Sequence, residues 1–126
     1  MLLLDSDFVI EIQRGSADAA NWLASTTEEL GLPAPVAWEI LYGSRNKAEL
    51  RKSNQFLTSF NVISVSPADS ALVESLIISH VLSSGLSLAD FLIAAQAISR
   101  NATLVTFNIK HFKVLPNLDV LVPYQR

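Results

Sequence analysis

Residues 2–10 read Leu-Leu-Leu-Asp-Ser-Asp-Phe-Val-Ile, and this stretch decides the fold class. Three consecutive apolar residues that end at Asp5 are typical of a buried strand in a parallel sheet. The residues that follow indicate a helix from Ser6 to Arg14, which Gly15 ends. In an open parallel sheet the ligand site lies beyond the carboxyl ends of the strands. Asp5 and Asp7 therefore mark a strand-to-helix junction at which we expect chemistry.

Short apolar runs alternate with helical patterns along the rest of the chain, which indicates βαβ units and an α/β fold with a parallel sheet. We expect strands near residues 2–5, 32–36, 62–65, 103–106 and 119–122, and helices over residues 6–14, 17–24, 36–43, 50–60, 66–84 and 87–100. Pro33 and Pro35 favour an edge position for the second strand. Only Asp90 and Gln96 are polar among residues 88–98, so that helix is expected to be central and buried.

The composition limits the class of protein. The 126 residues are 50% hydrophobic and 17% charged, with four Gly, five Pro and no Cys. A chain of this composition and length folds as one domain, residues 1–126, without a structural metal. The absence of Cys excludes disulfides and fits a reducing cytoplasm, and the apolar runs are too short to span a membrane. The net charge of −3 argues against attraction to nucleic acid over the whole surface, although a local basic strip could bind it.

Further acids stand at the starts of helices. Glu39 follows the second strand, and Asp90 opens the buried helix. Each acid also has a plain structural interpretation: Asp5 can cap a helix, Glu39 can stabilise a helix N-terminus, and Ser87-Leu-Ala-Asp90 has the form of a capping box. A parallel sheet nevertheless collects these junctions on one edge, where carboxylates repel one another unless a cation joins them. Oxygen ligands without His or Cys favour Mg²⁺ or Mn²⁺.

Four motifs in order carry a resemblance to a known family. They are LLDSDFVI at residues 3–10 with Arg14-Gly15, AWEILYG at 37–43, GLSLADFLIAA at 85–95 and LVTFNIKHF at 104–112. Together they resemble PIN-domain proteins of the VapC toxin type over nearly the whole chain. The resemblance implies a PIN-like α/β/α sandwich with a five-stranded parallel sheet of order 3-2-1-4-5. It also implies a homodimer, Mg²⁺- or Mn²⁺-dependent endoribonuclease activity on RNA, and inhibition by a cognate antitoxin.

The resemblance assigns roles to single residues as well. The family's three principal catalytic and metal-binding acids correspond to Asp5, Glu39 and Asp90. Its fourth acidic position is Asn108 in this chain, which favours one bound metal ion over two, and Asp7 is expected to offset part of the missing charge. Thr106 matches a hydroxyl that orients metal-bound water, but it also fits an ordinary β-branched strand residue.

Attack by metal-activated water implies products with 5′-phosphate and 3′-hydroxyl ends. The candidate RNA-binding cations are Arg14, Arg45, Lys47, Arg51 and Lys52, although the cluster at residues 45–52 also fits a solvated helix face. Trp38 either stacks on a base or belongs to the core. His80 and His111 lie far from any carboxylate in sequence, so we expect ordinary core or surface histidines rather than ligands.

Two other functions remain open. Asp5-Ser-Asp7-Phe-Val fits the DxDx(T/V) signature of haloacid-dehalogenase-like phosphatases, in which the first Asp is the nucleophile, but the other motifs of that class are missing. The second alternative is a catalytically inactive PIN-like binding module, which only Asn108 supports.

The apolar residues of several helices exceed what one sheet can cover. We expect part of them to lie in a homodimer interface and part to receive an antitoxin helix, whose basic side chain would displace the metal. The residues expected on these surfaces include Trp22, Leu23, Leu50, Phe56 and Leu57.

Overall fold

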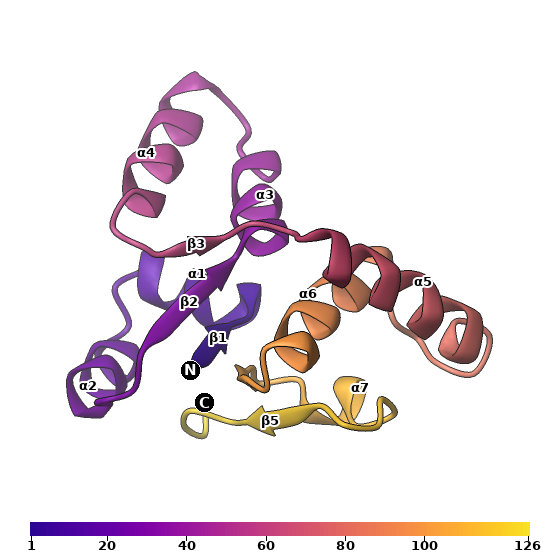
Figure 1. Cartoon of the computed structure of the whole chain (residues 1–126). Coiled ribbons are helices and arrows are strands. Elements are labelled where there is room, and N and C mark those ends of the chain that lie inside the picture. The colour runs from indigo at the N-terminus through magenta and orange to yellow at the C-terminus, as the bar shows by residue number, and fades with distance from the viewer.

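A parallel sheet of five short strands forms the centre of the computed structural model, which describes all residues from 1 to 126 (Figure 1). The strands lie in the order β3-β2-β1-β4-β5, so the order expected from the resemblance is confirmed. The elements along the chain are β1 (Leu2–Leu4), α1 (Ser6–Gln13), α2 (Ala17–Ser25), β2 (Leu30–Pro33), α3 (Ala34–Tyr42), α4 (Lys47–Leu57), β3 (Val62–Ile63), α5 (Pro67–His80), α6 (Leu88–Ser99), β4 (Thr103–Val105), α7 (Ile109–Phe112) and β5 (Asp119–Leu121).

Strand β1 is the middle of the sheet and of the hydrophobic core. Leu2 pairs with Leu30 of β2 on one side and with Thr103 of β4 on the other. All three leucines of β1 are buried because helices cover the sheet. The apolar run that begins the chain therefore has the position that its composition predicts.

The helices α4, α3, α6 and α5 form a row across the molecule (Figure 1), with contacts between each neighbouring pair. Helix α6 is buried over Ile93–Ala97 and packs against α5, α3 and β4, which confirms the expectation for this segment. None of the helices is long and apolar enough to cross a membrane.

The edge position expected for the second strand is wrong, because β2 lies between β3 and β1. Pro33 is the last residue of β2, and Pro35 lies in the first turn of α3, where a helix has no partner for the backbone N–H. The N–H of Leu32 is the one that has to reach the neighbouring strand, and it donates to the carbonyl of Asn61 at 2.8 Å. Two prolines thus end a central strand without breaking it.

The fifth helix is shorter than expected, because α5 ends at His80 rather than near residue 84. Both the N–H and the hydroxyl of Ser83 donate to the carbonyl of His80, which closes a turn after the helix. Of the five apolar residues named as expected partner surface, only Leu50 is exposed, at 46%. Leu57 is buried, while Trp22, Leu23 and Phe56 pack against the core, so they are not free surface.

Candidate functional site

Four carboxylates lie near one another: Asp5 and Asp7 follow β1, Glu39 lies in the second turn of α3, which follows β2, and Asp90 lies in the first turn of α6. We call them the acidic cluster: Asp5, Asp7, Glu39 and Asp90. Asp5 directly follows β1 and caps α1, where its Oδ1 accepts a hydrogen bond from the N–H of Ser6 at 2.8 Å. The capping interpretation and the functional interpretation of Asp5 are therefore compatible, because only one of its two oxygens caps the helix.

Thr106 joins the first two acids of the cluster. Its Oγ1 lies 2.8 Å from Oδ2 of Asp5 and 3.1 Å from Oδ2 of Asp7, and the hydroxyl hydrogen can be donated to either oxygen. The same Oγ1 accepts from the backbone N–H of Asn108 at 3.1 Å. Thr106 is also fully buried. Its hydrogen bonds hold the two carboxylates in place relative to the loop after β4, so its role is not limited to packing in the strand.

Asp7 also holds that loop directly. Its Oδ2 accepts from the backbone N–H of Phe107 at 3.0 Å, whereas its Oδ1 is buried and has no hydrogen-bond partner. Asn108, the other residue expected at this secondary site, is exposed and makes no side-chain cap for α7. The structure therefore brings Asp7 and Thr106 to Asp5, while Asn108 joins them through its backbone.

The electrostatics of Asp5 are unusual for a carboxylate. Burial, followed by the neighbouring charge of Asp7, raises the pKa of Asp5 to about 6, and Asp90 contributes in the same direction. Hydrogen bonds from Thr106 and Ser6 oppose this shift but do not cancel it. Ionised Asp5 thus lacks a compensating cation.

We expect Asp5→Asn to stabilise the metal-free protein at pH 7.5 by up to about 3 kcal/mol. Because the folded-state pKa lies above the ordinary value of 3.8, the folded state binds more protons, and stability falls as the pH rises from about 4 to 6. Urea unfolding in EDTA at pH 4.5 and 7.5 measures this effect. The advantage of the variant should grow with pH, and a variant that is less stable than wild type at pH 7.5 would contradict the prediction.

Asp90 occupies the N-terminal capping box of α6 and has a second contact that its sequence position does not suggest. Its Oδ2 accepts from the N–H of Ser87 at 2.9 Å and lies 2.8 Å from Nε2 of His111. His111 is therefore not an ordinary core or surface histidine, as expected from the sequence, but a neighbour of the acidic cluster. The contact joins residues 21 positions apart, so it depends on how the loop after β4 folds back.

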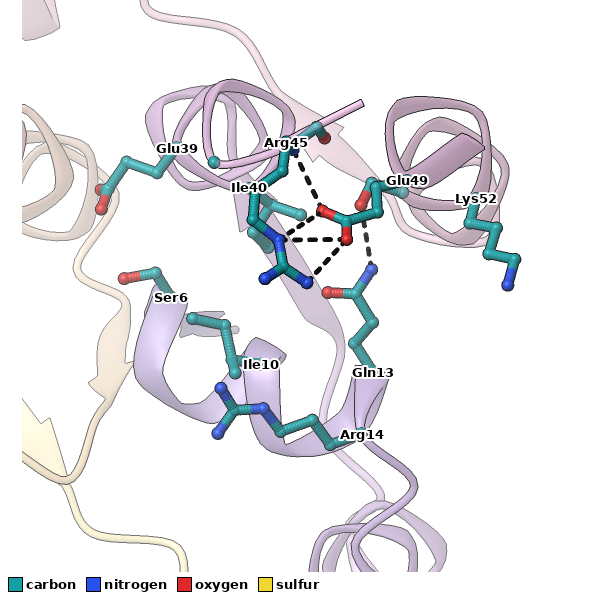
Figure 2. A pocket seen from close by; sticks show the side chains of 12 residues that line it. Ser6, Ile10, Gln13, Arg14, Glu39, Ile40, Arg45, Glu49 and Lys52 are labelled. Carbon is teal, nitrogen blue, oxygen red and sulfur yellow. Dashed lines mark hydrogen bonds and ion pairs between the residues drawn. The ribbon is translucent and has the colours of Figure 1, made fainter. Parts of the chain in front are cut away.

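Glu39 lies at the end of a pocket of about 630 Å³ between α1, α3 and α4 (Figure 2). Figure 2 shows the Glu39 carboxylate and the Ser6 hydroxyl projecting to the same side of the pocket, from α3 and α1. Partial burial and the charge of Asp90 raise the pKa of Glu39, while the nearby Ser6 side chain lowers it. Glu39 and Asp5 thus both respond to Asp90, which indicates that the three acids share one electrostatic site.

The five candidate RNA-binding cations separate into two groups. Arg14, Arg45 and Lys52 line the same pocket as Glu39. Arg45 is neutralised by Glu49, since its Nη2 lies 2.8 Å from Oε2 of that residue. The other two cations, Lys47 and Arg51, line a separate shallow hollow with Leu41, Leu50 and Asn54.

Trp38 is 55% exposed, so its placement in the core is wrong. The buried face of α3 includes Val36, Ala37 and Ile40, and Trp38 faces solvent beside Glu39. An exposed indole next to an acid of the cluster is available to stack on a base.

The acidic cluster fits a divalent cation by its chemistry. Its donors are carboxylate oxygens, Oδ1 of Asp7 is buried without a partner, and burial with neighbouring anions disfavours ionised Asp5. No group of three or more Asp, Glu or His side chains is close enough to hold an ion as the side chains stand. Binding would therefore need side-chain rotations, and Glu39, on an exposed turn of its helix, has room to make them.

Comparison with known proteins identifies relatives of this chain. The family model of the PIN domain matches residues 2–117. The chain is 32% identical to the protein named ribonuclease VapC19 of Mycobacterium tuberculosis over 124 residues, which cover 94% of this chain and 98% of the relative. It is 29% identical to ribonuclease VapC of Rickettsia bellii over 128 residues, covering 95% of this chain and 94% of that protein.

Solved structures agree with these sequence matches. The fold resembles that in the crystal structure of VapBC2 from Rickettsia felis bound to a promoter DNA fragment, with a TM-score of 0.83, 27% identity, and coverage of 95% of this chain and 96% of the other. DNA-bound VapBC from Salmonella typhimurium also gives a TM-score of 0.83, with 17% identity and the same coverage. That second likeness concerns the fold alone.

Proposed function

Because this chain belongs to the PIN-domain family, we propose that it is a toxin-type endoribonuclease that a cognate antitoxin inhibits. The observation that carries the proposal is the acidic cluster at the edge of the sheet, which adjoins a pocket with cationic side chains. The carboxylates would hold a metal ion, and the cations would bind the phosphates of RNA. Relatives named ribonuclease VapC, which match nearly the whole chain, support the same activity.

We assign the principal metal-binding role to Asp5, Glu39 and Asp90, with Asp7 and Asn108 at a secondary position. A bound Mg²⁺ or Mn²⁺ would lower the pKa of a water molecule and stabilise negative charge on the scissile phosphate. Thr106 holds Asp5 and Asp7 in place through its hydroxyl, and this hydroxyl is the group we propose for orienting the attacking water. No side chain has to act as a nucleophile, and the products carry 5′-phosphate and 3′-hydroxyl ends.

The proposal is tested by incubating the purified protein with RNA in EDTA and then in excess Mg²⁺ or Mn²⁺. We expect cleavage only with the metal, and 3′-hydroxyl ends on the products. Millimolar Mn²⁺ should also raise the thermal midpoint, because the ion binds the folded state. An unchanged midpoint together with metal-independent cleavage would contradict a carboxylate-held ion.

We predict that Arg14→Ala/Lys52→Ala raises KM for RNA about tenfold, because these two cations line the pocket beside Glu39 without an ion-pair partner. The slope of log affinity against log salt should become shallower by about 1–2, since roughly 0.7 counterions are released for each phosphate contact of a single strand. Cleavage and fluorescence-anisotropy binding between 50 and 300 mM salt measure both quantities. The matched control is Lys47→Ala/Arg51→Ala, which removes two cations from the other hollow. If both double variants changed KM and the salt dependence equally, the prediction that RNA binds in the pocket beside Glu39 would be contradicted.

The antitoxin is the protein partner we propose, because the structures that this fold matches are of VapBC systems. A basic side chain of such a partner would compete with the metal for the carboxylates of the acidic cluster. Co-expression with the adjacent gene, followed by purification and an RNA assay, tests this mechanism. Cleavage should be suppressed in the complex and partly restored by excess Mn²⁺.

We also propose a homodimer, in which the end of α5 is covered. Ile78 is 76% exposed and Leu82 is fully exposed, which is unfavourable for a monomer in water. We predict a mass near twice 13.8 kDa in sedimentation equilibrium at micromolar concentration, and a monomer for Ile78→Asp/Leu82→Asp. Leu50→Asp, on α4, is the control that should stay dimeric. A monomeric wild type, or a dimer that survives the double substitution, would contradict this interface.

A further inference from the structure

Two helices of this protein begin with the same Ser-x-x-Asp capping box, and the carboxylates of the two boxes are used differently. At α5, both oxygens of Asp69 are occupied: Oδ2 accepts from the N–H of Ser66 at 2.8 Å, and Arg100 donates to both Oδ1 and Oδ2. Ser99 donates a further hydrogen bond to Oδ1, and Asp69 is fully buried. This acid has no oxygen left for a ligand.

At α6, the carboxylate of Asp90 has one engaged oxygen and one free oxygen. Its Oδ2 accepts from the N–H of Ser87 and contacts Nε2 of His111, whereas no hydrogen bond reaches Oδ1. The carboxylate lies near the other acids, since its charge contributes to the raised pKa values of Asp5 and Glu39. The two boxes thus differ in the partner that the rest of the chain supplies: an arginine that takes both oxygens, or a histidine that takes one.

The imidazole of His111 is itself held in place. Its ring meets the buried ring of Phe112 edge to face, with 5.6 Å between the centroids. The loop before α6 approaches from another side, because a Cβ built on Gly85 would lie 3.9 Å from Cε1 of His111. The backbone N–H of His111 donates to the carbonyl of Asn108 at 3.2 Å. A ring fixed in this way can restrict the rotation of a carboxylate.

Building on the proposed function, we propose that His111 is a positioning residue: its Nε2–H donates to Oδ2 of Asp90 and leaves Oδ1 as the oxygen for the catalytic metal. A neutral imidazole with the hydrogen on Nε2 is sufficient for this contact. Hydrogen-bonding partners behind metal ligands commonly change metal affinity 10- to 100-fold when they are removed. His111 would therefore act on metal binding rather than on RNA binding.

A pair of substitutions that differ by one methylene tests the hydrogen bond. The amide nitrogen of His111→Gln can occupy the place of Nε2, whereas His111→Asn reaches only the place of Nδ1. We expect the Gln variant to bind Mn²⁺ within about threefold of wild type and the Asn variant to bind it about tenfold more weakly. Calorimetric titration with Mn²⁺ measures this directly, without RNA. Cleavage by the Asn variant should recover at high Mn²⁺ with an unchanged KM for RNA.

Controls keep the outcomes distinct. The thermal midpoint in EDTA should be the same for wild type and both variants. Lys110→Ala, on the exposed part of α7, tests whether any substitution in this helix changes the affinity for Mn²⁺. Unchanged Mn²⁺ affinity of the Asn variant would overturn the positioning role, as would an equal loss in both variants. The proposed function would then still stand if wild type cuts RNA and Asp90→Asn does not. A wild type that binds no Mn²⁺ and cuts no RNA would overturn both.

Discussion

Asp5→Asn, Glu39→Gln and Asp90→Asn are each expected to lower RNA cleavage on the order of 10³-fold while the protein stays folded. Each substitution removes one negative charge from the acidic cluster and keeps the size of the side chain. The metal contributes several kcal/mol to the stabilisation of the transition state, and each 1.36 kcal/mol corresponds to about a factor of ten in rate. Single-turnover cleavage of end-labelled RNA at saturating Mn²⁺ measures the loss. Asp119→Asn, an exposed acid on β5, is the control that should cleave normally.

The same variants separate the ribonuclease from the alternative functions. In a haloacid-dehalogenase-like phosphatase, Asp5 would be the nucleophile and Glu39 would matter little. Wild type should therefore fail to hydrolyse p-nitrophenyl phosphate. Strong phosphatase activity that survives Glu39→Gln would overturn the ribonuclease assignment. A catalytically inactive PIN-like module would instead bind RNA without cutting it, with no difference among the three variants.

The sheet could be predicted because short apolar runs in the sequence indicate its strands. Buried parallel strands need short apolar runs, and residues 2–4 form such a run with an acid directly after it. Topology then places the acids on one edge, which is why Asp5, Glu39 and Asp90 could be selected from sequence. The electrostatic coupling of Asp90 to the other two agrees with that selection.

Features that depend on long-range packing could not be predicted. The contact between His111 and Asp90 requires the loop after β4 to fold against the start of α6. The sequence left open whether Trp38 is exposed or belongs to the core, because α3 is apolar on nearly all sides and few polar residues mark the face that meets solvent. Tertiary contacts decide the orientation of such a helix, and they are not visible in its periodicity.

One signal in the basic cluster was readable from the sequence. Lys47 and Arg51 are four residues apart, so they share one face of α4, while Lys52 lies about 100° around the helix from Arg51. The structure places Lys52 in the pocket with Glu39 and the other two in the separate hollow. The sequence analysis treated these cations as one cluster, but the helical spacing of α4 separates them into two surfaces.

Arg100→Ala is expected to lower the free energy of unfolding by about 3–5 kcal/mol, because it leaves the fully buried carboxylate of Asp69 without its cation. Burial raises the pKa of Asp69, but hydrogen bonds from Arg100, the backbone of Ser66 and the hydroxyl of Ser99 outweigh burial and hold this pKa well below its usual range. A lowered folded-state pKa contributes stability that is present above about pH 4 and is lost as the pH falls. Urea unfolding at pH 7 and pH 3 should show the variant losing much of this pH dependence.

The ion pair joins the first turn of α5 to the C-terminal end of α6. Arg45→Ala breaks an exposed ion pair on α4 and should cause no measurable loss of stability, since solvent screens such pairs. Asp69→Leu/Arg100→Met removes both charges and should recover most of the loss caused by Arg100→Ala, because the penalty comes from the unpaired buried charge rather than from the missing pair. If the double variant were as unstable as Arg100→Ala, the geometry of the capping box, and not its charge, would be what holds α5 against α6.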